Sequence, residues 1–311
     1  MEKLNLNSNT EIFSAKNITK YWRDIQPSLN SSQFTDETFP PNHNSLYSKN
    51  ENGEYVDVRD GKYYEDKLNF YGGEFGWKRA SEIFKGVNNC FIFEDEIDPN
   101  DIMQGKLGDC YFLAAISAIA KFPSLIKQLF RTEEINEQGF YEIVMFIDGE
   151  WQIVFIDDYF PVINGIEMLA FAGSKNNELW VCILEKAWAK VNGGYSNCQA
   201  GLQKEVFLAF TGAAHSWIPH IEKTKEELWD IITTAEKMNK IMASDSRCNQ
   251  DEKNGIVAGH AYSLIGAKSK LHEGQELRLI KLRNPWGFME WTGDWSDNSS
   301  YGQMNLNFIL N

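Results

Sequence analysis

The feature that most constrains the fold of this chain is an apolar run over residues 111–120 that follows a glycine-containing turn. The segment QGKLGDCYFLAAISAIA spans residues 104–120 and places Cys110 where the turn meets the apolar run. Because residues 111–120 are apolar on nearly every helical face, they predict a helix buried at the centre of the protein. Only the first turn of that helix can then face a cleft, and Cys110 lies in that turn.

Cys110 is a candidate nucleophile because of this position. A cysteine at a helix N-terminus faces unsatisfied backbone N–H groups and the positive end of the helix dipole, and both favour the thiolate form. Free cysteines are usually buried and pack as small hydrophobic residues. That interpretation applies to the four cysteines that lack a glycine turn and a helix start, which are Cys90, Cys182, Cys198 and Cys248.

Composition narrows the class of protein. The chain has 311 residues, of which 43% are hydrophobic, as in an ordinary globular protein of two modest domains or one body split by a cleft. Its 30 basic and 44 acidic residues give a net charge of −14. This charge excludes nonspecific binding to nucleic acid or to an anionic membrane, and it favours divalent cations as charged partners.

Cysteine usage and the hydropathy pattern predict a soluble cytoplasmic protein. Five cysteines without a CxxC pair argue against a disulfide framework and against a thiolate zinc site, and a reducing compartment fits best. The first residues lack the apolar stretch of a signal peptide, and no run approaches the length of a membrane span. We therefore expect no stable membrane insertion.

The chain divides into three parts of different character. Residues 1–75 are polar and rich in turns, which predicts an extended arm. Residues 76–211 contain the Cys110 helix, a hairpin joined by Asp-Gly in YEIVMFIDGEWQIVF, and helices in LWVCILEKAWAKV and LQKEVFLAF that end at glycines. Residues 212–311 predict a sheet-rich part. The fold class is therefore α+β, with a helix-rich half, an antiparallel-sheet half and an active site in the cleft between them.

The sheet-rich part begins with a helix. Thr224 and Glu227 form a capping box that opens an amphipathic helix through about Met242. Two strands are then predicted in GHAYSLIGAKS and ELRLIKLRN. If these strands pair as an antiparallel hairpin, His260 at the start of the first and Asn284 at the end of the second come together.

His260, Asn284 and Gln104 supply the other groups that a thiol nucleophile needs. The thiol requires a base, and the base requires an orienting partner. Asn284 is held extended by the proline that follows it, and its side-chain oxygen can accept the Nδ1 hydrogen of His260. The Gln104 amide can join the Cys110 backbone N–H in an oxyanion hole. Taken alone, each residue has an ordinary interpretation: His260 as a partly buried histidine, Asn284 as a turn residue and Gln104 as a loop amide.

Several motifs together resemble the protease core of the calpain family, which are papain-like, two-lobed cysteine proteases. These motifs are QGKLGDCYFLAA, GHAYSL and LRNPWGFMEWTGDWSD, with FTDETFPPNHNSL, GWKRASEIF and LEKAWAKVNGGY, so that the resemblance covers residues from about 34 to 300. It implies that Cys110 is the nucleophile, His260 the general base and acid, Asn284 the orienting residue and Gln104 the oxyanion donor. Trp286 would shield the bond between His260 and Asn284 from water.

The resemblance also implies regulation by calcium, which binds carboxylate and other oxygen ligands. Asp101 and Glu185 match the family's site in the first half, and Glu290 and Asp297 match the site in the second. Three features depart from the family pattern: Tyr111 replaces the usual tryptophan, Pro99-Asn100 stand where many members have a basic residue, and the chain ends before the final core strands. We therefore expect a core that is truncated at its C-terminus, without an EF-hand loop.

The leading hypothesis is an intracellular calcium-dependent cysteine endopeptidase that hydrolyses peptide bonds through a thioester acyl-enzyme. Its partners would be protein substrates, together with additional domains or a regulatory subunit outside this chain. The main alternative is a catalytically inactive calpain-like scaffold or binding domain. Acyl transfer to an amine, as in transglutaminases, is a third hypothesis, but those enzymes usually orient the histidine with an aspartate.

Overall fold

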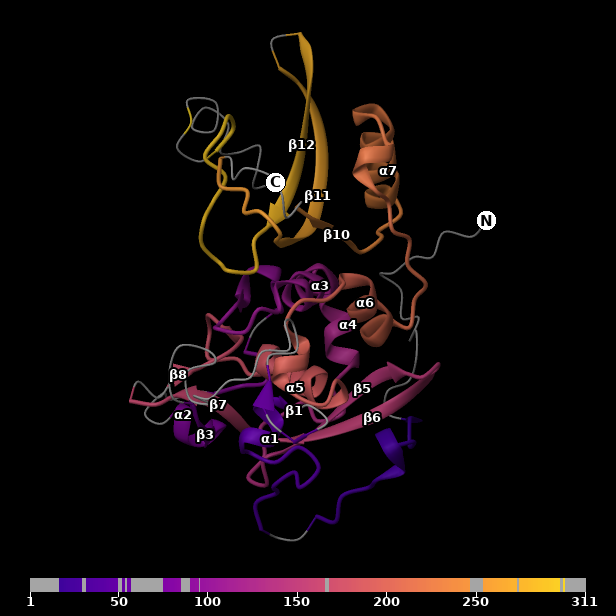
Figure 1. Cartoon of the computed structure of the whole chain (residues 1–311). Helices are drawn as coiled ribbons and strands as arrows, with labels where there is room; N and C mark the ends of the chain where they lie inside the picture. Colours follow the sequence, from indigo (N-terminus) through magenta and orange to yellow (C-terminus); the bar gives the residue numbers. More distant parts are fainter. Residues whose placement is uncertain are drawn as a thin grey trace.

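The computed structural model shows a mixed α+β protein, as the sequence predicts (Figure 1). It describes residues 17–29, 32–49, 52–53, 55–56, 75–84, 90–94, 96–165, 168–246, 254–272, 274–296 and 299. The α-helices in this part of the chain are α1 (His43–Leu46), α2 (Ala80–Ile83), α3 (Cys110–Ala120), α4 (Pro123–Gln128), α5 (Trp180–Val191), α6 (Gln203–Thr211) and α7 (Lys225–Lys237).

The strands form several small antiparallel sheets. Their bounds are β1 (Ser48–Lys49), β2 (Tyr55–Val56), β3 (Phe75–Arg79), β4 (Ile102–Met103), β5 (Phe140–Ile147), β6 (Glu150–Asp157), β7 (Tyr159–Ile163), β8 (Met168–Leu169), β9 (Gly173–Ser174), β10 (Met242–Asp245), β11 (Ala261–His272) and β12 (Gln275–Arg283). The described sheets have the orders β3-β7-β8 and β10-β11-β12, together with the pairs β1-β2, β4-β9 and β5-β6.

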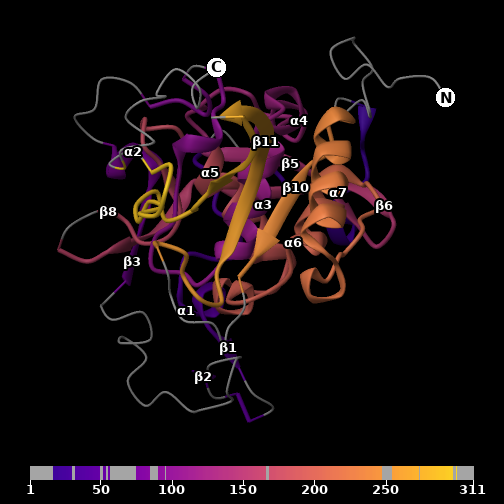
Figure 2. The ribbon, with the colours of Figure 1, turned by 90° about the horizontal axis from the view of Figure 1, so that it is seen from above.

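Helix α3 is the centre of the core. Residues 111–120 are all buried, as their apolar composition predicts. Strands β10 and β11 contact α3 on one side, and α6 packs against it on another (Figure 2). A buried bond of 2.7 Å from Ser263 Oγ of β11 to the Ala114 carbonyl fastens the sheet to the helix. Packing around this helix thus brings β11, which is distant in the sequence, close to Cys110.

The structure confirms the predicted Asp-Gly hairpin and the predicted helix end near Gly212. Strands β5 and β6 pair in register from Phe140 with Asp157 to Ile147 with Glu150. The connecting residues Asp148 and Gly149 have φ values of 53° and 82°, as a two-residue turn with two positive φ angles requires. Helix α6 ends at Gly212, whose φ of 63° lies in the left-handed region that glycine adopts without strain.

The helix that the capping box opens is shorter than the sequence analysis expects. Thr224 Oγ1 accepts the Glu227 backbone N–H at 3.1 Å, so the capping box is present. The helix nevertheless ends at Lys237, and the expected last residue, Met242, begins β10 instead. Met242 pairs with Leu264 across the β10-β11 ladder. The helix stops before Asn239, whose φ of 53° lies in the left-handed region, and strand pairing then determines the structure from Met242.

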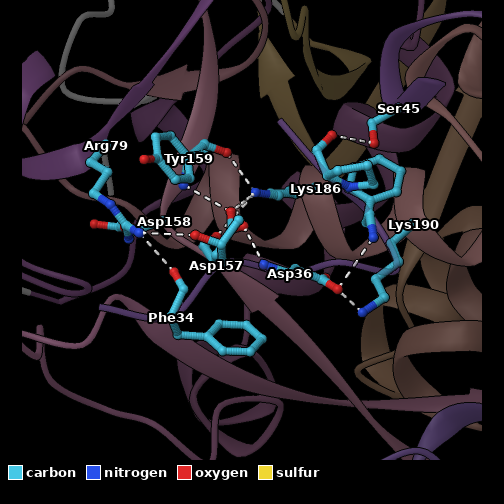
Figure 3. A network of polar contacts seen from close by, with 12 residues as sticks. Phe34, Asp36, Ser45, Arg79, Asp157, Asp158, Tyr159, Lys186 and Lys190 are labelled. Carbon is cyan, nitrogen blue, oxygen red and sulfur yellow. Dashed lines mark hydrogen bonds and ion pairs between the residues drawn. The ribbon is translucent and has the colours of Figure 1, made fainter. Parts of the chain in front are cut away.

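Buried ion pairs fasten residues 34–39 to the rest of the protein (Figure 3). Lys190 Nζ of α5 lies 2.7 Å from Asp36 Oδ2, and both side chains are almost fully buried. Lys186 pairs with Asp157, whose other carboxylate oxygen accepts the Asp36 backbone N–H at 2.7 Å. Because these charges lie away from water, each needs the partner that the fold provides. The part of the predicted arm around Asp36 is thus joined to α5 and to the end of β6.

No helix of the described residues is long and apolar enough to span a lipid bilayer. Cys90, Cys110, Cys182 and Cys198 are all free of disulfides, and Cys182 and Cys198 lie in the core as expected. Cys248 falls outside the described residues.

Candidate active site

Cys110 is the first residue of α3, as predicted. Its thiol meets the backbone of Ala261, the first residue of β11, and a hydrogen bond from that backbone lowers the pKa of the thiol. Burial acts in the opposite direction and is the larger effect, so that the pKa of Cys110 lies above its ordinary value. The backbone N–H groups of Tyr111 and Ala261 favour the thiolate, in the direction expected for a helix N-terminus, and burial outweighs them.

The His260 ring bonds to Asn284. The distance from His260 Nε2 to Asn284 Oδ1 is 2.7 Å. The two residues meet because β11 and β12 pair as an antiparallel hairpin, with Ser263 opposite Arg283, and His260 and Asn284 directly flank the paired strands. The contact uses Nε2, whereas the sequence analysis assigns it to Nδ1. The correction leaves Nδ1 as the ring nitrogen that can exchange a proton with a thiol.

Asn284 is held in one orientation by its neighbours. Its Nδ2 donates to the Phe288 carbonyl at 3.0 Å, and its Oδ1 also accepts the Trp286 backbone N–H at 3.0 Å. The Trp286 ring lies against the His260 ring, with centroids 4.5 Å apart and planes inclined at 44°. Trp286 is therefore in the position where it can shield the bond between His260 and Asn284, as the resemblance implies.

Burial also affects the His260 ring. It lowers the pKa of His260, and the hydrogen bond to Asn284 partly opposes that effect. Burial therefore acts against the charged form of both the thiol and the imidazole. Among the described residues, no hydrogen bond joins the Cys110 sulfur directly to the His260 ring.

Gln104 lies between the turn before Cys110 and the strand end that carries Asn284. Its backbone N–H donates to the Pro285 carbonyl at 3.0 Å, which connects the two parts of the site. Its side-chain Nε2 donates to the Leu107 carbonyl at 2.7 Å. An amide NH₂ group carries two hydrogens, so one remains for a substrate oxygen.

Tyr111 fits the position where the family usually has tryptophan. Its hydroxyl accepts the Trp188 indole N–H of α5 at 3.0 Å, and Gly201 lies so close to the ring that any added Cβ would overlap with it. Its buried hydroxyl is thus partnered, and the aromatic replacement packs without an unsatisfied polar group.

The structure places Asp101 and Glu185, the carboxylates predicted to bind calcium in the first half, in different surroundings. Glu185 is buried in α5, where its Oε1 accepts the Ala172 backbone N–H at 3.0 Å and its carboxyl group faces Asp109. Burial raises the pKa of both Asp109 and Glu185, and the Asp109 charge raises that of Glu185 further. Two buried carboxyl groups in contact favour a shared proton. Glu185 therefore lies beside the side chain of Asp109, the residue that precedes Cys110 in the chain.

Glu178 is one of two carboxylates, with Asp98, whose charges act on Asp101. Burial raises the pKa of Asp101, and repulsion from Glu178 raises it further. Glu178 is 2% exposed, and it accepts hydrogen bonds from the Glu94 backbone at 2.9 Å and from Ser174 Oγ at 3.1 Å. In the sequence, Glu178 is an acidic residue in a polar stretch just before α5. From that position alone it would be interpreted as an acid that caps the helix, and not as a metal ligand. Only the pairing of β4 with β9 brings its segment to Asp101.

The second predicted calcium site is partly outside the described residues. Glu290 is exposed, and its charge acts on Arg283. Asp297 falls outside the part of the chain that the structure describes. Within the described ranges, no group of three or more acidic, histidine or cysteine side chains is arranged to hold a metal ion.

A hollow of about 510 Å³ lies away from the predicted catalytic residues. It is lined by Cys90, Phe91, Ile92, Phe93, Lys127, Glu133, Glu134 and Ile135. The expected position of the active site in a cleft between two halves therefore stays a prediction.

The set of residues at this site, a helix-tip cysteine near a histidine bonded to an asparagine amide, is the one that papain-like cysteine proteases use. A model of the calpain family cysteine protease matches residues 34–304. The chain therefore belongs to the calpain family of cysteine proteases.

The curated relatives agree with this family. The calpain-1 catalytic subunit of Sus scrofa is 35% identical over 282 residues, which cover 86% of this chain and 36% of the relative. That of Homo sapiens is 34% identical over 280 residues, with the same coverage. The calpain-type cysteine protease DEK1 of Arabidopsis thaliana is 33% identical over 280 residues, 12% of its length. The chain thus spans little more than a third of the calpain-1 subunits that it matches.

Proposed function

We propose that this chain forms the core of a calcium-dependent cysteine endopeptidase of the cytoplasm, which hydrolyses peptide bonds through a thioester acyl-enzyme. The observation that carries the proposal is the 2.7 Å contact between His260 Nε2 and Asn284 Oδ1, beside the strand whose first residue meets the Cys110 thiol. Family membership supports the reaction class. The four disulfide-free cysteines of the described residues fit a reducing compartment.

The proposed reaction uses these residues in two stages. His260 Nδ1 accepts the Cys110 proton as the sulfur bonds to the substrate carbonyl carbon, and the imidazolium then gives this proton to the departing amine. The C–N bond breaks and a thioester forms. His260 Nδ1 next takes a proton from a water molecule as the water oxygen attacks the thioester carbon. The C–S bond then breaks, the carboxylic acid product leaves, and the proton goes to the Cys110 sulfur. Asn284 keeps Nε2 engaged through both stages.

Two donors would stabilise the tetrahedral intermediate. The Cys110 backbone N–H is among the first N–H groups of α3, which have no partner within the helix. The second hydrogen of the Gln104 amide is the other donor, since the first is on the Leu107 carbonyl. Donors aimed at a developing oxyanion contribute about 3 kcal/mol each.

The proposed arrangement has two lobes, residues 76–211 and 212–311, after the arm of residues 1–75. Two hydrogen bonds join these parts of the chain. The Gln104 backbone N–H donates to the Pro285 carbonyl, and the Arg283 side chain donates to the Ile102 carbonyl. The first lobe would contribute the nucleophile and the oxyanion donors. The second would contribute the base and its orienting residue.

Calcium would be held in the first lobe by Asp101 and Glu178. Both are hard oxygen donors that repel each other when ionised, so a cation between them would relieve that repulsion. Bound calcium would supply positive charge beside the loop that leads to Gln104. Glu290 and Asp297 stay the proposed carboxylates of a second site.

Labelling with a thiol-directed peptidyl inhibitor tests the enzymatic function. We expect calcium-dependent modification of Cys110, located by mass spectrometry, together with cleavage of casein. His260→Ala should abolish hydrolysis while the circular dichroism spectrum stays the same. If the folded protein is neither labelled nor active with or without millimolar calcium, the alternative of an inactive calpain-like scaffold is correct.

The calcium assignment has its own test. The shift in melting temperature on adding calcium should be reduced in Glu178→Gln and kept in full in Glu185→Gln, which is matched to it in burial. The reverse result would assign the metal to the carboxylate pair of Asp109 and Glu185. This readout does not depend on catalytic activity.

A further inference from the structure

Asp245 is an acidic side chain at the candidate active site that none of the proposed catalytic steps uses. It is the last residue of β10 and lies directly opposite Ala261 in the antiparallel ladder. Ala261 follows His260 in the chain, and its backbone meets the Cys110 thiol. The strand register therefore places Asp245 next to the residues between which a substrate must bind.

A buried amide holds the Asp245 carboxylate in place. Gln203, in the first turn of α6 and only 6% exposed, donates from Nε2 to Asp245 Oδ1. This bond engages one carboxylate oxygen, and the Asp245 residue is exposed to solvent. A carboxylate fixed in this way keeps acceptor capacity for a second donor, because each oxygen has two lone pairs.

The charge of Asp245 acts on both catalytic groups. It raises the pKa of Cys110 and that of His260. Asp109 also raises the pKa of Cys110, but its side chain is fully buried and faces Glu185. A bound substrate can therefore reach the carboxylate of Asp245 but not that of Asp109.

We propose that Asp245 selects substrates with a lysine or arginine side chain within three residues of the scissile bond. This inference rests on the proposed endopeptidase function. A cationic side chain there would lie within reach of a carboxylate that Gln203 has already oriented, so that little ordering is required on binding. A glutamate or aspartate at the same substrate position would be repelled. The excess of acidic over basic residues in the chain adds to the same preference.

The test uses fluorogenic peptides that differ at one position, from the third residue before the scissile bond to the second after it, with lysine, glutamine or glutamate. With calcium present, we expect kcat/KM for the lysine peptide to exceed that for the glutamine peptide by about fivefold at one position, the ratio for a favourable exposed ion pair. Asp245→Asn should remove this ratio, and Asp245→Lys should reverse it in favour of glutamate. Added salt should weaken the preference of the unaltered chain but not cleavage of the glutamine peptide.

The ratio of kcat/KM between the lysine and glutamine peptides distinguishes a role of Asp245 in specificity from a purely structural role. If Asp245 only supports the fold, both variants lose activity on all peptides equally and the preference remains. Glu150→Gln serves as a matched control in the β5-β6 hairpin and should keep the preference. If the unaltered chain cleaves the glutamine peptide without favouring lysine at any position, the inference is wrong and the endopeptidase function stands. If no peptide is cleaved and Cys110 is not labelled, the proposed function fails, and the inference fails with it.

Discussion

Replacing Asp36 with asparagine tests whether a buried ion pair fastens the N-terminal segment to α5. Asp36 Oδ2 lies 2.7 Å from Lys190 Nζ, which also donates to the Phe155 carbonyl at 2.8 Å. Burial lowers the pKa of Lys190 from 10.5 to about 8, although the Asp36 charge raises it. That lowering corresponds to about 3 kcal/mol by which the fold disfavours the charged lysine even with its partner present.

Loss of the Asp36 charge leaves a buried cation without its counterion. Removing one partner of a buried pair typically costs about 3–5 kcal/mol. We expect the lower end of that range, because an asparagine can still accept the Thr38 backbone N–H that Asp36 Oδ1 accepts at 3.0 Å. The free energy of unfolding of Asp36→Asn should therefore fall by about 3 kcal/mol at pH 6.

The loss should depend on pH in a defined direction. Because the folded pKa of Lys190 is below its unfolded value, the unfolded chain binds more protons between the two, and stability rises with pH in that window. In Asp36→Asn the folded pKa is lower still, so the rise begins at lower pH than in the unaltered chain. The difference between the two proteins should therefore narrow as pH increases toward about 8.

Urea unfolding followed by tryptophan fluorescence at several pH values measures both effects. Glu150→Gln is the matched control, since Glu150 pairs with Lys20 at the surface, with side chains 59% and 46% exposed. That substitution should change stability far less than Asp36→Asn does, because solvent screens an exposed ion pair. A loss in Asp36→Asn no larger than in the control, or one that does not change with pH, would refute the reasoning.

Three further predictions concern the candidate active site. Asn284→Ala removes the acceptor of His260 Nε2 and should lower kcat about a hundredfold through misplacement of the ring, with little change in KM; unchanged steady-state kinetics would contradict this role. Gln104→Ala should lower kcat by about a hundredfold if its amide is an oxyanion donor, and only the melting temperature if its single role is the bond to the Leu107 carbonyl. Because burial raises the pKa of Cys110, its alkylation by iodoacetamide should still increase above the pH of about 8.5 at which a free cysteine is half ionised. A rate, followed by mass spectrometry, that levels off at lower pH would show that the thiolate is already favoured.

Local sequence determined the elements of the site. Residues 111–120 could be assigned to a buried helix because their apolar character has no polar face. Asp148-Gly149 determined a hairpin because both residues tolerate positive φ. The same kind of local signal placed Cys110 at a helix tip, His260 before a strand and Asn284 after one.

Tertiary structure decided what those local signals leave open. Pairing with β11 made a strand of Met242–Asp245, because ladder hydrogen bonds formed with a distant partner outweigh helical periodicity. The fold brought Glu178 rather than Glu185 to Asp101, and it turned Nε2 of His260 toward Asn284. It also buried Cys110 enough to raise its pKa against the effect of the helix N-terminus. Sequence spacing determines which side chains lie at the ends of elements, whereas desolvation and contacts between distant segments exist only once the core has packed.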